Sequence, residues 1–264
     1  MSYRLTFLGS GSSGGVPRVA GGWGACDPKN PKNRRRRCAV LIERVGTKGI
    51  TTVLVDTPPD VREGLLAHDV MRVDGVLFTH DHADHTHGLD DLRGFALTTK
   101  ARVPVYMDAP TFESLESRFR YCFEAKPSSN YPPILKRHPI TPGETIRIDG
   151  PGGPIDALPV LVEHGEIMAL GFRVENMLYT PDISAMPAAS ERFLEDLDLW
   201  IVDALRPMPH GSHWSVKQAL AAIAKYKAKR AILTHMTHEL DYEELARSLP
   251  KHITPAYDGL VVTF

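Results

Sequence analysis

The chain has 264 residues, 42% of them hydrophobic, and a formal net charge of −1, which argues against a general electrostatic grip on DNA or RNA. No apolar run approaches the ~20 residues of a membrane-spanning helix, and the first residues enter an expected strand without room for a signal peptide. Three cysteines do not suggest a disulfide framework, so we expect a cytoplasmic protein that binds neither DNA nor membranes.

In the first half of the chain, short apolar runs alternate with turns rich in glycine and proline. Helices are expected at 60–68, 89–98 and 111–123, and strands at 5–8, 39–42, 52–56, 73–78 and 103–107. The stretch 126–137 is rich in Pro, Ser and Asn. We expect it to be irregular and consider it a candidate loop over a functional site.

The second half continues the same pattern. Helices are expected at 191–196, 215–226 and 242–249, and strands near 146 and at 155–162, 169–174, 176–179, 199–202, 231–233 and 260–264. Strand-rich halves with interspersed helices favour two sheets packed together with helices outside. With no visible linker or repeat, we expect residues 1–264 to form one domain.

The strongest chemical signal is the run His80-Asp81-His82-Ala83-Asp84-His85, which directly follows the apolar stretch 76–78. Imidazole and carboxylate groups are the usual ligands of Zn²⁺, Mn²⁺ and Fe²⁺, and cellular supply decides among these ions. One ion cannot take all of these ligands with sensible geometry. The run therefore predicts two metal ions and a metal-dependent hydrolase.

Further candidate residues also lie next to expected strands and helices. His164, Asp182 and His235 each follow a strand, and His213 precedes a helix. Asp56 ends a strand, and we expect it to orient metal-bound imidazoles, which usually need such a partner.

The order of these residues resembles the metallo-β-lactamase superfamily, and the match spans the whole chain. The resemblance implies an α/β fold, a four-layer αββα sandwich with the metals at one edge of the two sheets. By position, one ion would be held by His80, His82 and His164. The second would be held by Asp84, His85 and His235. Asp182 would bridge the two ions, so that both carboxylates, Asp84 and Asp182, take part in catalysis.

Within the superfamily, the segments 7–17, 33–37, 209–215 and 233–238 look like those of PhnP-type phosphodiesterases. This resemblance implies hydrolysis of a small cyclic phosphodiester of a phosphoribosyl or nucleotide-like compound, and a homodimer. His213 matches a late histidine of related phosphodiesterases and is expected to protonate the leaving oxygen, with Asp203 to orient it. The alternative for His213 is a helix N-terminal residue without chemistry.

The same resemblance allows a structural zinc held by Cys26, Cys38 and His238. The chain departs from the family pattern here, because it lacks closely spaced cysteines and a fourth ligand would have to be Asp27 or a distant group. The arginine run 34–37 is expected to be a solvated face. As the alternative, one or two of these arginines would bind a second phosphate of the substrate.

Other functions on the same scaffold remain open. A tRNA 3′-processing nuclease needs a basic surface and a protruding arm. The net charge of −1 does not indicate a basic surface, and the sequence has no Gly/Pro-rich insertion for such an arm. A lactonase or thioester hydrolase would use the same nucleophile on a carbonyl carbon. A non-catalytic nucleotide-binding protein is disfavoured, because every ligand type of the superfamily is present.

Overall fold

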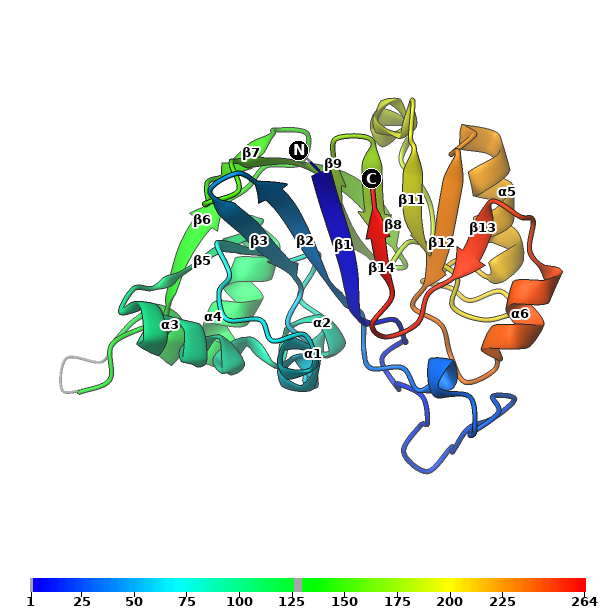
Figure 1. Cartoon of the computed structure of the whole chain (residues 1–264), viewed down its shortest axis with the longest axis horizontal. Helices are drawn as coiled ribbons and strands as arrows, with labels where there is room; N and C mark the ends of the chain where they lie inside the picture. The colour runs from blue at the N-terminus through cyan, green and yellow to red at the C-terminus, as the bar shows by residue number, and fades with distance from the viewer. Residues whose placement is uncertain (1, 126–129) are drawn as a thin grey trace.

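The computed structural model describes residues 2–125 and 130–264, which form two seven-stranded sheets (Figure 1). The first sheet has the spatial order β14 (Val261–Thr263), β1 (Ser2–Gly9), β2 (Ala39–Gly46), β3 (Gly49–Val55), β4 (Gly75–Leu77), β5 (Val103–Met107) and β6 (Leu135–Pro139). The second has the order β13 (Ile253–Pro255), β12 (Arg230–Thr234), β11 (Leu199–Asp203), β10 (Met177–Thr180), β9 (Ile167–Val174), β8 (Ile155–His164) and β7 (Ile146–Ile148).

Helices cover the outer faces of the two sheets (Figure 1). Beside the first sheet lie α1 (Val61–Ala67), α2 (Ala83–Thr86), α3 (Arg93–Thr99) and α4 (Ala109–Phe123). Beside the second lie α5 (Val216–Tyr226) and α6 (Tyr242–Ser248). Three short 3₁₀ helices complete the set: η1 (Pro31–Asn33), η2 (Leu89–Leu92) and η3 (Ala188–Leu194). The expected four-layer αββα sandwich is confirmed.

Strands of the first sheet are apolar on both faces because both faces are covered. Phe7 of β1 is buried in the core shared with the second sheet, whereas Leu8 is buried in the smaller core under the helices. The same alternation separates Val53 from Leu54 in β3. Successive side chains of a strand point to opposite faces, so these short apolar runs fill two cores at once.

Strand direction explains where polar side chains collect. Strands β3 to β6 run parallel to one another, as do β10 to β13. Strand β8 is antiparallel to β9, and β9 to β10, so β8 runs in the same direction as β10. The carboxyl ends of parallel strands meet at one edge of a sheet, where α/β proteins commonly bind ligands.

Several segments differ from the expectation, among them the 3₁₀ helix η1, which was not expected. Part of the stretch expected to be irregular forms β6, which pairs with β5 although its sequence alternates poorly; residues 126–129 of the candidate loop lie outside the described residues. The short strand β13 is additional, the helix expected at 191–196 is the 3₁₀ helix η3, and part of the histidine run is helical in α2. Within 2–125 and 130–264, no helix combines the length and apolar character needed to cross a bilayer.

Candidate metal centre

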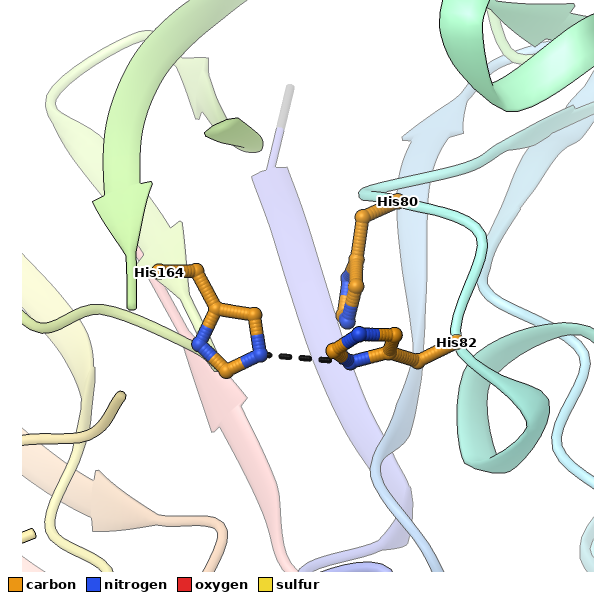
Figure 2. Close-up of side chains that lie close together, drawn as sticks. All are labelled: His80, His82 and His164. Carbon is orange, nitrogen blue, oxygen red and sulfur yellow. Dashed lines mark hydrogen bonds between the residues drawn. The ribbon is translucent and has the colours of Figure 1, made fainter. Parts of the chain in front are cut away.

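The predicted ligands lie at the carboxyl ends of strands from both sheets. His80 and His82 follow β4, and Asp84 and His85 lie on α2. The second sheet contributes His164 at the end of β8, Asp182 after β10 and His235 after β12. Figure 2 shows how His80 and His82 face His164 across the space between the sheets. Residues far apart in sequence therefore meet at one edge of the sandwich.

The first predicted ligand set is compact. The rings of His80, His82 and His164 each offer a nitrogen, and these atoms lie within 4.8 Å of one another. The nearest approach joins His164 Nε2 and His82 Nδ1 at 3.2 Å. Of the three side chains only that of His82 is exposed, so this set opens toward solvent on one side.

The second predicted set lies beside the first. Ligand atoms of Asp84, His85 and His235 also lie within 4.8 Å of one another. Asp182 stands between the sets, with Oδ2 3.0 Å from His85 Nε2 and Oδ1 3.4 Å from His235 Nε2 and 3.8 Å from His164 Nε2. The structure thus brings all seven predicted residues together, and Asp182 has the place of a shared carboxylate.

These residues fit a pair of metal ions because their buried polar atoms are otherwise unsatisfied. In the described part of the chain His80 Nε2 and His235 Nε2 have no hydrogen-bond partner, and His85 Nε2 and Asp182 Oδ2 have only their mutual contact at 3.0 Å. Leaving a buried polar atom without a partner costs about 1–3 kcal/mol, so this cluster of atoms demands a common partner. A divalent cation coordinated by imidazole and carboxylate supplies one.

Asp56 fixes the orientation of two ligand histidines. Its Oδ2 accepts a hydrogen bond from His85 Nδ1 at 2.8 Å and another from the Thr79 hydroxyl at 2.8 Å. Because that hydroxyl donates to Asp56, it accepts from His80 Nδ1, 2.9 Å away. In this arrangement both imidazoles have a free Nε2 lone pair that faces the centre.

His164 is held in the same way by the backbone. Its Nδ1 donates to the carbonyl oxygen of Ser212 at 2.7 Å, which leaves Nε2 as the free lone pair. Two residues of the centre also have left-handed backbone conformations, with φ of 64° at Asp56 and 57° at His235. Such strain in residues other than glycine clusters at functional sites, where surrounding structure enforces it.

Burial and neighbouring charges set protonation states that suit metal binding. Burial lowers the pKa of His80 well below its usual value and that of His164 to about 4. Burial opposes ionisation of Asp182, but His235 and His85 outweigh it and hold the pKa of that carboxyl well below its usual range. Burial also disfavours the charged form of His85, but Asp182, Asp84 and Asp56 outweigh it and raise the pKa of that imidazole well above its usual value. At neutral pH His80 and His164 are therefore neutral and Asp182 is ionised, whereas a metal ion would have to displace a proton from His85.

His213 stands next to this cluster. Its Nδ1 donates to Asp203 Oδ2 at 2.7 Å, as the sequence predicted, which leaves Nε2 free. Its ring lies 4.6 Å from that of His164 and 4.7 Å from that of His235, between centroids. The Asp203 carboxylate is completely buried and also accepts the Ile183 N–H, so it holds the imidazole in one orientation.

Comparison with known proteins places the chain in a family. The model of the beta-lactamase superfamily domain matches residues 51–236, which include all seven clustered residues. The chain belongs to this superfamily. The chain is similar to the crystal structure of a diphosphatase from the PhnP family, with 36% sequence identity and a TM-score of 0.89. The similarity covers all of this chain and 98% of the other.

Two further comparisons are less specific. Human tRNase Z, short form, has a TM-score of 0.65 with 18% identity over 98% of each chain, which shows the shared fold alone. A curated Porphyromonas gingivalis protein named octanoyltransferase is 31% identical over 97% of this chain. That relative is longer, and the chain spans about half (51%) of its length.

The zinc site that the PhnP resemblance allowed stays a prediction, and the arrangement of its residues does not favour it. Cys26 Sγ donates to the Leu240 carbonyl at 3.3 Å, whereas Cys38 Sγ lies 3.4 Å from Thr234 Oγ1. No metal-type cluster among the described residues contains a cysteine. Arg35 Nη1 lies 3.7 Å from Cys26 Sγ, so a guanidinium already places a positive charge where a zinc ion would be repelled.

Arg35 also corrects the expectation of a solvated arginine run. Its side chain is 2% exposed and donates to the carbonyls of Thr237 at 3.1 Å and Leu240 at 2.8 Å. Arg36 and Arg37 are partly buried and paired with Asp258 and Asp60, and Arg34 is exposed. The run therefore anchors the N-terminal loop to the segment after His235.

Sequence reasoning missed two supports of the centre. Thr79, which links Asp56 to His80, is adjacent to the histidine run, and a hydroxyl next to a ligand is a usable signal. The Ser212 carbonyl that holds His164 carries no such signal, because any residue supplies a backbone carbonyl.

Proposed function

We propose that this protein is a binuclear metal-dependent hydrolase that cleaves phosphorus–oxygen bonds in a small phosphodiester, with a cyclic phosphoribosyl or nucleotide-like compound as the substrate class. The observation that carries the proposal is the convergence of two three-residue clusters on the shared carboxylate of Asp182, beside the His213–Asp203 pair. Paired metal sites of this kind are typical of phosphoryl hydrolysis.

In this proposal the two ions are held by His80, His82 and His164 and by Asp84, His85 and His235, with Asp182 shared. When bound, zinc, manganese or iron ions lower the pKa of water and draw charge from phosphoryl oxygens. Asp56 and Ser212 keep the ligand lone pairs aimed at the centre, and Asp182 keeps two positive charges from repelling each other.

His213 supplies the proton that the leaving oxygen needs. An alkoxide leaves poorly, and a proton delivered from Nε2 of His213 converts it to an alcohol as the phosphorus–oxygen bond breaks. Asp203 keeps Nδ1 of His213 occupied, so that Nε2 is the nitrogen left to face the substrate. Burial lowers the pKa of His213, so the protonated ring gives up its proton readily. After the step His213 is neutral and regains its proton from solvent.

Two related substrate classes have support from relatives. A PhnP-family protein with 36% identity is named a diphosphatase, which favours a diphosphate bond as the second candidate at phosphorus. The longer relative named octanoyltransferase, of which this chain spans about half, is the reason for testing an acyl compound as well, since a carbonyl carbon accepts the same nucleophile. We propose a homodimer that binds a small molecule rather than DNA.

The test is a comparison of substrates on one metal-reconstituted preparation. A ribosyl cyclic phosphate, bis-p-nitrophenyl phosphate, a nucleoside diphosphate sugar, a lactone and an octanoyl thioester are assayed side by side. We expect turnover of the phosphodiesters, with kcat/KM well above that for the carbonyl compounds. Cleavage of lactone or thioester without turnover of any phosphorus compound would overturn the proposal.

A further inference from the structure

A contact outside the ligand set joins α4 to the histidine run. Arg118 Nη2 donates to the backbone carbonyl of Asp81 at 2.9 Å and to Asp81 Oδ2 at 2.8 Å. The Ser114 hydroxyl, one turn earlier on α4, donates to the same carboxylate and accepts from Arg118. Arg118 Nη1 also donates to His87 Nε2 at 3.1 Å. One guanidinium thus ties both ends of the segment 81–87.

These hydrogen bonds hold the backbone on one side of His82. The Asp81 carbonyl belongs to the peptide unit that joins Asp81 to His82, so a bond to it fixes the backbone that carries His82. On the other side of His82, its own carbonyl accepts the Thr86 hydroxyl at 2.8 Å. His82 is the exposed member of its ligand set, whereas His80 and His164 are immobilised by burial.

The two ligand sets differ in what supports them. His85 is completely buried and hydrogen-bonded to Asp56, and His235 is buried at the end of β12. Neither contacts Arg118. The helix α4 itself is anchored by its cap, because Asp108 accepts the Thr111 N–H at 3.1 Å, and buried Leu115 packs it on the first sheet. The helix α4, which is kinked at Phe119 directly after Arg118, therefore supports the first set from outside.

We propose that Arg118 is a positioning residue of the metal centre, which holds His82 in place and so sets the affinity of the first ion, held by His80, His82 and His164. The inference rests on the proposed binuclear site. Asp81 and Arg118 are about one third exposed, at 35% and 32%, and exposed pairs contribute little to folding stability. The effect is expected on metal binding rather than on the fold.

The experiment is a Zn²⁺ titration of metal-free protein by calorimetry against a competing chelator, repeated with Co²⁺ to follow its visible absorption. Wild type is expected to bind two ions. Arg118→Ala is expected to weaken the first ion about tenfold, the lower end of the effect of removing an outer partner of a metal ligand. It should weaken the second ion clearly less, because Asp84 and His85 also lie within the segment 81–87 but Arg118 bonds the peptide unit next to His82. Arg118→Lys should not restore the affinity, since one ammonium cannot reach both Asp81 and His87.

The matched control is Arg120→Ala on the same helix, because Arg120 is exposed and pairs with Glu124 away from the centre. It should bind both ions as wild type does. Wild-type affinities in Arg118→Ala, or an equal loss for both ions, would overturn the inference. A wild-type protein that binds no metal would instead overturn the proposed function. If Arg118→Ala does not fold by circular dichroism, Ser114→Ala decides: a smaller loss at the same ion supports the inference, and none rejects it.

Discussion

At the scale of single residues, two aspartates outside the proposed ligand set orient the imidazoles of the site. Asp56 and Asp203 are both completely buried, and each accepts an imidazole Nδ1–H, from His85 and His213 respectively. Since Nδ1 is occupied, Nε2 is the reactive nitrogen in both rings. Asp56 and Asp203 therefore orient His85, a proposed metal ligand, and His213, the proposed acid, in the same way, with Nδ1 bonded and Nε2 free.

The role of His213 predicts a dependence on the leaving group. His213→Ala should slow cleavage of a ribosyl phosphodiester about 10²–10³-fold, since its alkoxide needs a proton, and should barely affect bis-p-nitrophenyl phosphate. Steady-state kcat/KM for the two substrates measures this difference. His252→Ala, an exposed histidine elsewhere on the surface, is the control. Equal slowing of both substrates would remove His213 as the acid.

Asp258 predicts a pH dependence of stability. Burial raises the pKa of Asp258 to about 6 from an ordinary value of 3.8, although Arg36 and Ser10 donate to it. The folded state therefore binds the proton more tightly, so wild type loses stability as pH rises from about 4 to about 6, by at most about 3 kcal/mol.

Asp258→Asn removes this titration and should gain stability relative to wild type over the same pH range. Urea unfolding of both proteins at pH 4.5 and pH 7 measures the free energy of unfolding. Subtracting the wild-type value from the variant value at each pH cancels the contributions of other titrating groups. A constant difference across the two pH values would contradict the shifted pKa.

At the scale of elements, the site depends on where strands end and on what holds the loops beside them. Strands β4, β8, β10 and β12 each place a ligand within a few residues of their carboxyl ends. The N-terminal loop between β1 and β2 packs on the segment after β12, because Ser12 N–H donates to the Met236 carbonyl and Arg35 bonds two carbonyls beyond it. Arg35 therefore supports the backbone next to His235.

Removing this anchor should destabilise the protein. Arg35→Ala removes the guanidinium donor from the carbonyls of Thr237 and Leu240, which keep only the longer bonds from the Leu240 N–H and the Cys26 thiol, and it leaves a cavity where a large buried side chain was. The expected cost is about 2–4 kcal/mol in the free energy of unfolding. Chemical unfolding of metal-free protein measures the loss. Arg34→Ala, an exposed neighbour, should stay within about 0.5 kcal/mol of wild type. A similarly small effect of Arg35→Ala would contradict the anchoring role.

At the scale of the whole molecule, the centre joins the two sheets. The first sheet supplies the histidine run after β4, and the second supplies His164, Asp182 and His235. An ion bound between them adds a cross-link that the unfolded chain lacks, so binding energy becomes folding energy.

Metal ions should therefore raise the Tm of the purified protein. At a free concentration one hundred times Kd, each site adds about 2.7 kcal/mol, and chelation should reverse the effect. Differential scanning fluorimetry with and without Zn²⁺ or Mn²⁺ measures the shift. The double variant His82→Ala/His235→Ala loses a ligand from each set and should show none. The same shift in that variant would mean that the ions bind elsewhere.

The sequence by itself determined the layers of the fold and the residue types of the centre. Apolar runs with strand periodicity define most strands, and the order of histidines and aspartates identifies the superfamily. The sequence did not predict β6 or α2, because the local pattern of apolar and polar residues is weak in both. The strand β6 forms by pairing with β5, and the helix α2 follows β4. Pairing between distant segments leaves little trace in either segment alone.

Only the tertiary structure decided which neighbours complete the site. It separated Cys26 from Cys38, buried Arg35 where an exposed charge was expected, and joined Arg118 to the histidine run. Each result depends on contacts between residues far apart in the chain. Hydrogen bonds and burial are properties of positions in space, and a sequence lists the groups without stating which of them meet.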